Sequence, residues 1–222
     1  MDTEKKLIKS FVSNRYMDEQ KSRQSCLVMA LETARILSGR DKDSGKSRKN
    51  YTSDILKSEF ITNNQFGTAD NLAGLINYLQ LLDLIGNVFI SLKDTIYKTL
   101  KKYSSITDDK ECRTVVALRN CLVHNYGLIN IPHNKKNVKS RHKFSLLLND
   151  GTMDMIKIPI TRWDGNYADK DKSTNTQIDV CKLIDAIEET YQNLKEKAEK
   201  GELKLCLNGG VAELKARFTI IS

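Results

Sequence analysis

The segment TVVALRNCLVHNYGLI, residues 114–129, sets Arg119, Asn120 and His124 into an otherwise apolar stretch. An imidazole titrates near neutral pH and can act as a base or as an acid. A guanidinium group matches two oxygens of a phosphate, and a neighbouring amide can orient either group. These side-chain types at this spacing favour acid–base chemistry at a phosphate.

A helix over about residues 108–125 would have to position these groups. At about 100° per residue, its apolar side chains form one broad arc, which contains Val115, Val116, Leu118, Leu122, Val123 and Tyr126. Arg119 falls inside this arc, and Asn120 and His124 share the adjoining polar edge. A guanidinium in an apolar stripe is costly unless it is paired or borders water. A carboxylate from the last helix would be a structural partner for Arg119, and His124 would then be an ordinary capping or core histidine.

Residues 119–126, RNCLVHNY, resemble the R-x4-6-H motif of HEPN domains, in the R-x4-H-x-Y version of the HepT-like toxins. The resemblance implies an α-helical bundle and a metal-independent endoribonuclease that acts as a homodimer in toxin–antitoxin or other defence systems. It implies catalytic roles for Arg119 and His124, with Asn120 as the polar residue that often follows the arginine. It also implies that a partner nucleotidyltransferase, the antitoxin, attaches AMP to Tyr126.

The positions of Arg119 and His124 lie about 140° apart on an ideal helix. One helix would not easily aim both side chains at a single phosphate, whereas two helices meeting across a two-fold axis could combine them and supply a second histidine. We therefore expect a homodimer with Arg119 in its groove. For Tyr126 the alternative is a packed ring, because the tyrosine continues the apolar arc.

The segment after the motif, residues 127–143, is rich in lysine and arginine. Between Gly127 and Lys143 there is no acidic residue, and five basic side chains are predicted to contact RNA phosphates: Lys135, Lys136, Lys139, Arg141 and Lys143. A solvated connection is the alternative, and His133 and His142 are expected in the same exposed loop. None of the 3 histidines stands at ligand spacing from a cysteine or an acid. The sequence therefore predicts no metal site and no cofactor.

Helical patterns surround the motif. Apolar spacing predicts helices at about residues 22–38, 68–89, 93–104 and 177–201. The intervening GRDKDSGKS, residues 39–47, resembles a phosphate-binding P-loop, but its spacing is one residue too long and it follows a helix instead of a strand. We therefore expect a solvated basic loop there.

The stretch from about residue 127 to 177 departs from a compact bundle. Alternating apolar runs flank NDGT, residues 149–152, which predicts a β-hairpin. The tail, residues 203–222, is ambiguous between a hairpin and a short helix. The whole chain, residues 1–222, is predicted to be one mainly α domain, a HEPN-like helical bundle with an inserted β-hairpin.

Composition narrows the class of protein. The 222 residues carry a net charge of +8, which favours a polyanionic partner such as RNA. No apolar run approaches the roughly 20 residues of a membrane helix, and the charged N-terminus lacks the apolar core of a signal peptide. The 5 cysteines form no CxxC pair. These features predict a cytoplasmic protein with reduced cysteines and no membrane contact.

The preferred hypothesis is an endoribonuclease that cleaves single-stranded RNA through Arg119 and His124. Two alternatives stay open. One is a non-catalytic HEPN-type module that binds RNA, a nucleotide or a partner protein. The other is a purely structural bundle in which the motif arises by chance.

Overall fold

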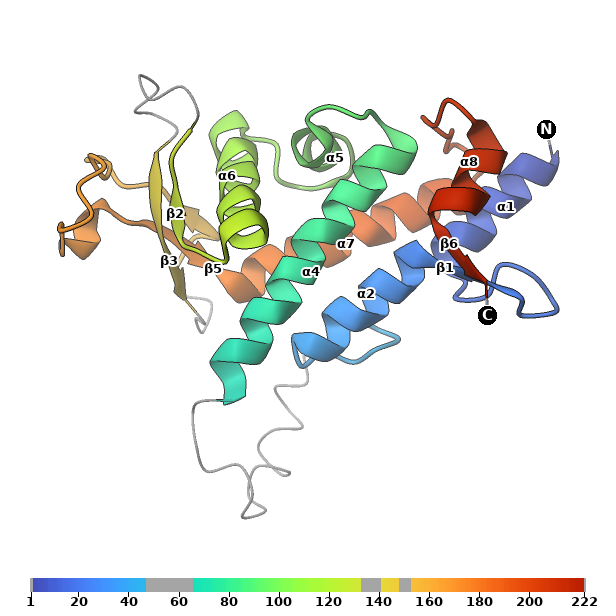
Figure 1. The fold of residues 1–222 in the computed structure, drawn as a ribbon, viewed down its shortest axis with the longest axis horizontal. Helices are drawn as coiled ribbons and strands as arrows, with labels where there is room; N and C mark the ends of the chain where they lie inside the picture. The colour runs from blue at the N-terminus through green and yellow to red at the C-terminus, as the bar shows by residue number, and fades with distance from the viewer. Residues whose placement is uncertain (1, 47–65, 133–140, 148–152, 222) are drawn as a thin grey trace, which may run out of the picture. The chain divides into compact units, whose positions relative to one another are not determined.

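A computed structural model gives the fold and describes residues 2–46, 66–132, 141–147 and 153–221 (Figure 1). Over these residues the protein is mainly helical with two small sheets, as the sequence predicts. The chain divides into two compact units. The first unit comprises Met1–Ser105 and Ile187–Ser222, and the second comprises Ile106–Ala186. That residues 1–222 form a single domain stays a prediction.

The first unit is built around α4, which is apolar on nearly all sides and must therefore be enclosed. Its helices are α1 (Asp2–Ser13), α2 (Cys26–Leu37), α4 (Phe66–Phe89), α5 (Thr95–Tyr103), α8 (Gly210–Arg217) and the part of α7 (Val180–Glu199) from Ile187 onward. Both α2 and α5 pack against α4, on which Leu75, Leu79 and Leu82 are fully buried. The four predicted helices are confirmed, although α7 begins three residues later than expected.

The two ends of the described chain belong to the same unit. α1 has no counterpart among the predicted elements, yet Ile8, Phe11 and Val12 are buried at helical spacing. β1 (Arg23–Ser25) pairs antiparallel with β6 (Thr219–Ile221). The ambiguous tail therefore forms a short helix, α8, followed by a strand that returns to the N-terminal segment.

The helix α4 comes closer to the length of a membrane span than the sequence analysis expected. Its stretch Leu72–Phe89 has 18 residues and a mean hydropathy of 1.4, long and apolar enough to cross a membrane by length and composition alone. Of this stretch, 61% is buried inside the protein, as in the core helix of a soluble protein.

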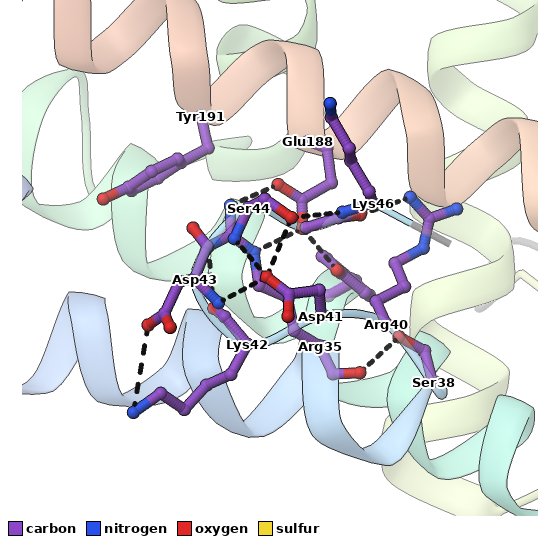
Figure 2. Close-up of polar contacts among 12 residues, drawn as sticks. Arg35, Ser38, Arg40, Asp41, Lys42, Asp43, Ser44, Lys46, Glu188 and Tyr191 are labelled. Carbon is purple, nitrogen blue, oxygen red and sulfur yellow. Dashed lines mark hydrogen bonds and ion pairs between the residues drawn. The ribbon is translucent and has the colours of Figure 1, made fainter. Parts of the chain in front are cut away.

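A buried ion pair ties three helices of this unit to the loop that follows α2 (Figure 2). Nε and Nη2 of Arg35 donate to the two carboxylate oxygens of Glu188 on α7 at 2.8 and 2.7 Å. The hydroxyl of Tyr78 on α4 donates to the same carboxylate at 2.5 Å. Arg35 and Glu188 are only 4% and 8% exposed. The charges are therefore desolvated and depend on each other.

The same arginine holds the loop of residues 40–46. Nη1 of Arg35 donates to the carbonyls of Lys42 and Asp43 at 2.9 and 2.8 Å, and Arg40 donates to the carbonyl of Gly45 at 3.1 Å. Gly45 has a φ of +70°, and a Cβ there would lie 2.6 Å from a Glu188 oxygen. Over its described part the backbone of the loop is therefore anchored on a buried charge, while Asp43, Ser44 and Lys46 are exposed, as expected of a solvated loop. Its residues from 47 onward lie outside the described residues.

The second unit combines α6 (Asp109–Asn125) with a four-stranded sheet that lies beside it (Figure 1). The strands are β2 (Ile129–Asn130), β3 (His142–Leu147), β4 (Ile156–Lys157) and β5 (Thr176–Asp179), in the order β2-β3-β5-β4. β3 and β5 are parallel, and the two outer pairs are antiparallel. A short 3-10 helix, η2 (Lys172–Thr174), precedes β5.

The predicted hairpin is wrong in its pairing. β5 lies between β3 and β4 and pairs with both, so the two predicted hairpin strands are not neighbours. Thr176 and Ile178 are buried, at 2% and 0% exposure. A buried strand is stabilised when its backbone groups form hydrogen bonds with a neighbouring strand on each side, as those of β5 do with β3 and β4. The NDGT turn, residues 149–152, lies outside the described residues.

The buried ion pair yields a prediction for stability. We expect Arg35→Met to lower the free energy of unfolding by about 3–5 kcal/mol, because it leaves the Glu188 charge buried without its partner. The double variant Arg35→Met/Glu188→Leu should lose less than the single variant, since no charge is then stranded. Urea unfolding followed by circular dichroism measures both.

The matched control is Arg217→Met, which removes an ion pair to Glu213 whose arginine side chain is 52% exposed. A pair on the surface contributes about 0–1 kcal/mol. If Arg35→Met cost no more than this control, the buried pair would not be the structural anchor described above.

Candidate functional site

α6 begins and ends almost where the sequence predicts, because both ends carry local signals. The carboxylate of Asp108 caps the first turn and accepts from the amides of Lys110 and Glu111 at 2.8 and 3.0 Å. At the other end Tyr126 takes the left-handed conformation, with φ 49° and ψ 33°. The amides of Tyr126 and Gly127 return to the carbonyls of the last turn, which closes the helix just after His124.

The three predicted catalytic residues come together on this one helix. Nη1 of Arg119 lies 3.0 Å from Nε2 of His124 and donates to Oδ1 of Asn120 at 3.2 Å. Asn120 and His124 are exposed, and Arg119 is half-buried. The Arg119 side chain leaves the helix on the buried side, near Val115 and Leu118, and its Nη1 reaches the exposed His124 and Asn120.

One helix brings Arg119 and His124 into contact, although their positions lie about 140° apart on an ideal helix. The angle of about 140° describes where the two side chains leave the helix, and the long arginine side chain crosses the difference. The expectation that one helix would not easily aim both side chains at a single phosphate stays a prediction. A homodimer with Arg119 in its groove stays a prediction.

The contact between Arg119 and His124 has one possible direction. A guanidinium N–H can only donate, so Nε2 of His124 accepts the hydrogen bond from Nη1 of Arg119. The site thus holds a basic nitrogen beside an anion-binding group, and a phosphate that draws the guanidinium away would free Nε2.

Tyr126 points away from the core. Its side chain is 81% exposed, so the packed alternative drawn from the helical wheel is wrong. The wheel fails because α6 ends at Asn125 and the left-handed backbone of Tyr126 turns its side chain out of the apolar arc. The phenol follows His124 by two residues and is accessible.

The basic segment is only partly described. Lys135, Lys136 and Lys139 lie outside the described residues. Nη1 of Arg141 donates to the carbonyl of Asp164 at 2.6 Å, and Nζ of Lys143 donates to the carbonyl of Asp169 at 2.5 Å. Both cations therefore bind the loop before β5, and contact of the five residues with RNA stays a prediction.

His142 lies in β3 and not in an exposed loop, so that expectation is wrong. It is 4% exposed, its Nδ1 lies 2.9 Å from the hydroxyl of Thr176, and its ring stacks on Phe144 with centroids 5.1 Å apart. Burial, and secondarily the charge of Arg162, lowers the pKa of His142 to about 4. His142 is therefore a neutral structural residue at neutral pH. His133 lies outside the described residues.

Over the described parts of the chain, no group of three or more His, Cys, Asp or Glu side chains is arranged to hold a metal ion. The comparisons with protein-family models, with curated proteins and with solved structures find no match. The likeness to HEPN domains therefore depends on residues 119–126 and on the helix that carries them.

His142 makes the stability of the protein sensitive to acid. Its folded pKa, about 4, is below the ordinary value of about 6.5, so the unfolded chain binds the proton more tightly. This contribution is complete above about pH 6.5 and is lost as the pH falls towards 4, by at most about 1.4 kcal/mol per pH unit. Urea unfolding at pH 7, 6 and 5 measures the slope.

The variant His142→Phe keeps an aromatic ring against Phe144 and should flatten the slope between pH 6 and 5. An unchanged slope in His142→Phe would show that another group causes the loss.

Proposed function

We propose that the protein is an endoribonuclease of the HEPN type that cleaves single-stranded RNA without a metal ion. One observation carries the proposal: Nη1 of Arg119 lies 3.0 Å from Nε2 of His124 at the exposed end of α6. The resemblance of RNCLVHNY to the HEPN motif supplies the reaction class. The net charge of +8 favours a polyanionic substrate. That the helices form a HEPN-like bundle is part of this proposal.

In the proposed reaction the RNA supplies its own nucleophile. Nε2 of His124 takes the proton of the 2′-hydroxyl, and the oxygen attacks the adjacent phosphorus. The guanidinium of Arg119 binds two non-bridging oxygens and stabilises the phosphorane, while Asn120 orients Arg119. The bond to the 5′-oxygen breaks, that oxygen takes a proton, and the products are a 2′,3′-cyclic phosphate and a 5′-hydroxyl.

The protonation of the leaving oxygen calls for an acid, and a homodimer would provide one. His124 of the partner subunit could donate this proton if the two motif helices meet. Apolar side chains follow the motif on the surface: Tyr126, Leu128 and Ile131 are 81%, 38% and 41% exposed. Exposed apolar groups in one short segment are typical of an interface, which supports the homodimer.

Tyr126 fits the role of a regulatory residue that a nucleotidyltransferase-type antitoxin modifies with AMP. The specific observation is its exposure combined with a positive φ of 49°. Glycine or asparagine would occupy this backbone position with less strain, so the tyrosine there costs some stability. AMP on this hydroxyl would add a phosphate and a base two residues from His124 and would block the site by charge and bulk.

The second candidate function is a non-catalytic HEPN-type module that binds RNA. The exposed Asn120 and His124 favour it as much as they favour cleavage, because both can contact RNA without reacting. Cleavage products distinguish the two functions, since a binding module retains RNA intact.

The cleavage assay tests the proposal directly. Wild-type protein with EDTA should cut single-stranded RNA and leave 2′,3′-cyclic phosphate and 5′-hydroxyl ends. His124→Ala should lower the rate by roughly 10² to 10⁴, the usual effect of losing an acid–base group, and Arg119→Ala should abolish cleavage with the fold intact. Mass spectrometry of the products identifies the ends.

The control is Lys110→Ala, which removes an exposed cation from the same helix far from His124. Its rate should match the wild type. Cleavage that requires a divalent metal, or that survives His124→Ala unchanged, would exclude the mechanism, and binding without any cleavage would favour the module.

The strain at Tyr126 leads to a separate prediction. Tyr126→Asn should raise the free energy of unfolding by about 0.5–1 kcal/mol, because asparagine tolerates the left-handed conformation. Tyr126→Phe keeps the strain and should give no gain. Urea unfolding compares the two variants, and a loss of stability in Tyr126→Asn would mean that the tyrosine side chain makes a stabilising contact.

A further inference from the structure

A cavity of about 280 Å³ opens between the end of α5 and the last turns of α7, within the first unit. Three lysines line it, Lys102, Lys197 and Lys200, together with Tyr103 and a single carboxylate, Glu196. The lining therefore carries three positive charges and one negative charge. A volume of this size is close to the lower end of small-molecule sites, about 300–1,000 Å³.

One face of α7 presents most of these groups. Asn193, Glu196, Lys197 and Lys200 recur at intervals of three and four residues, which brings them onto one side of the helix. Lys197 has a neighbour in Glu202 at 3.4 Å, but its side chain stays 42% exposed. An exposed pair of this kind is weak, so the ammonium can turn towards a stronger anion.

Tyr103 contributes a nearly buried, uncharged residue to this wall. The residue is 3% exposed, and Lys102 lies over its ring at 5.2 Å from the centroid. Burial raises the pKa of the Tyr103 phenol, and the charge of Lys197 acts in the opposite direction. The phenol is therefore protonated at neutral pH, and the Lys197 ammonium lies near it.

The end of α5 does not repel an anion as an open helix C-terminus would. The carbonyl of Leu100 accepts from the amide and the hydroxyl of Ser104, both at 2.9 Å. The carbonyl of Tyr103 accepts from Nδ2 of Asn193 at 2.9 Å. These donors satisfy two of the carbonyl groups at the end of α5 and so weaken the repulsion of an anion there.

We propose that this cavity binds the phosphate of a nucleotide, either free or within an RNA chain. Ammonium groups are suitable donors to phosphate oxygens, and the three lysines outnumber the two carboxylates, Glu196 in the lining and Glu202 beside Lys197. No local pattern in the sequence points to the site, because Lys102 and Lys200 come together only in the folded chain. The site is independent of the proposed cleavage at Arg119 and His124.

Isothermal titration at low salt tests the site with three probes: AMP, adenosine and a short single-stranded RNA. Wild type should bind AMP more tightly than adenosine. The double variant Lys197→Gln/Lys200→Gln should weaken AMP binding at least tenfold. Glu196→Gln should strengthen it several-fold, because it removes the carboxylate from the lining. The lysine variant should weaken AMP binding and the Glu196 variant should strengthen it, and a general loss of structure would not cause both changes.

The matched control is Lys204→Gln/Lys215→Gln, which removes two exposed lysines of the same unit outside the cavity and should leave AMP binding unchanged. The two sources of phosphate separate as follows. AMP that competes with RNA indicates a nucleotide site, whereas RNA binding that needs Lys197 and Lys200 without AMP binding indicates the RNA backbone.

Three results would overturn the proposal: no binding of AMP or RNA by wild type, adenosine binding as tight as AMP binding, or an equal loss in the control variant. His124→Ala should bind AMP like the wild type, so a failed cleavage assay and a failed phosphate site are distinguishable.

Discussion

The buried pair of Arg35 and Glu188 is the interaction on which the first unit depends. All three nitrogens of the guanidinium are engaged, two with the carboxylate and one with loop carbonyls. Such a pair adds little net stability over an apolar contact, because desolvation offsets the attraction. Its effect is to fix positions: it determines which turn of α7 faces α2 and where the loop of residues 40–46 must lie.

The position and ends of α6 were predictable from the sequence because their causes are local. Asp108 is a capping residue, and Gly127 follows the last turn. The convergence of Arg119 on His124 was not predictable, since a helical wheel records where a side chain leaves the helix and not how far it reaches. The helical wheel did not predict the exposure of Tyr126 for a related reason: it assumes that the helix continues, whereas α6 ends at Asn125.

Long-range pairings account for the other differences between prediction and structure. The residues of β5 alternate as a strand but adjoin α7, so Ile178 could equally be counted in the apolar stripe of that helix. Whether these residues form a strand or extend α7 depends on their pairing with β3 and β4, and both of those strands come from distant parts of the sequence. The burial of His142 likewise depends on Thr176, which is 34 positions away. A single sequence carries no record of such partners.

The return of the chain to the first unit has a consequence for the order of folding during synthesis. Arg35 waits for a partner 153 positions later, and β1 waits for β6 at the far end of the chain. The second unit, in contrast, is one continuous segment, Ile106–Ala186. All of its residues are made before Glu188, the partner of Arg35. The candidate cluster on α6 therefore belongs to a segment that is synthesised before the first unit is complete. The N-terminal helices can already pack on one another during that time, but Arg35 still lacks its partner.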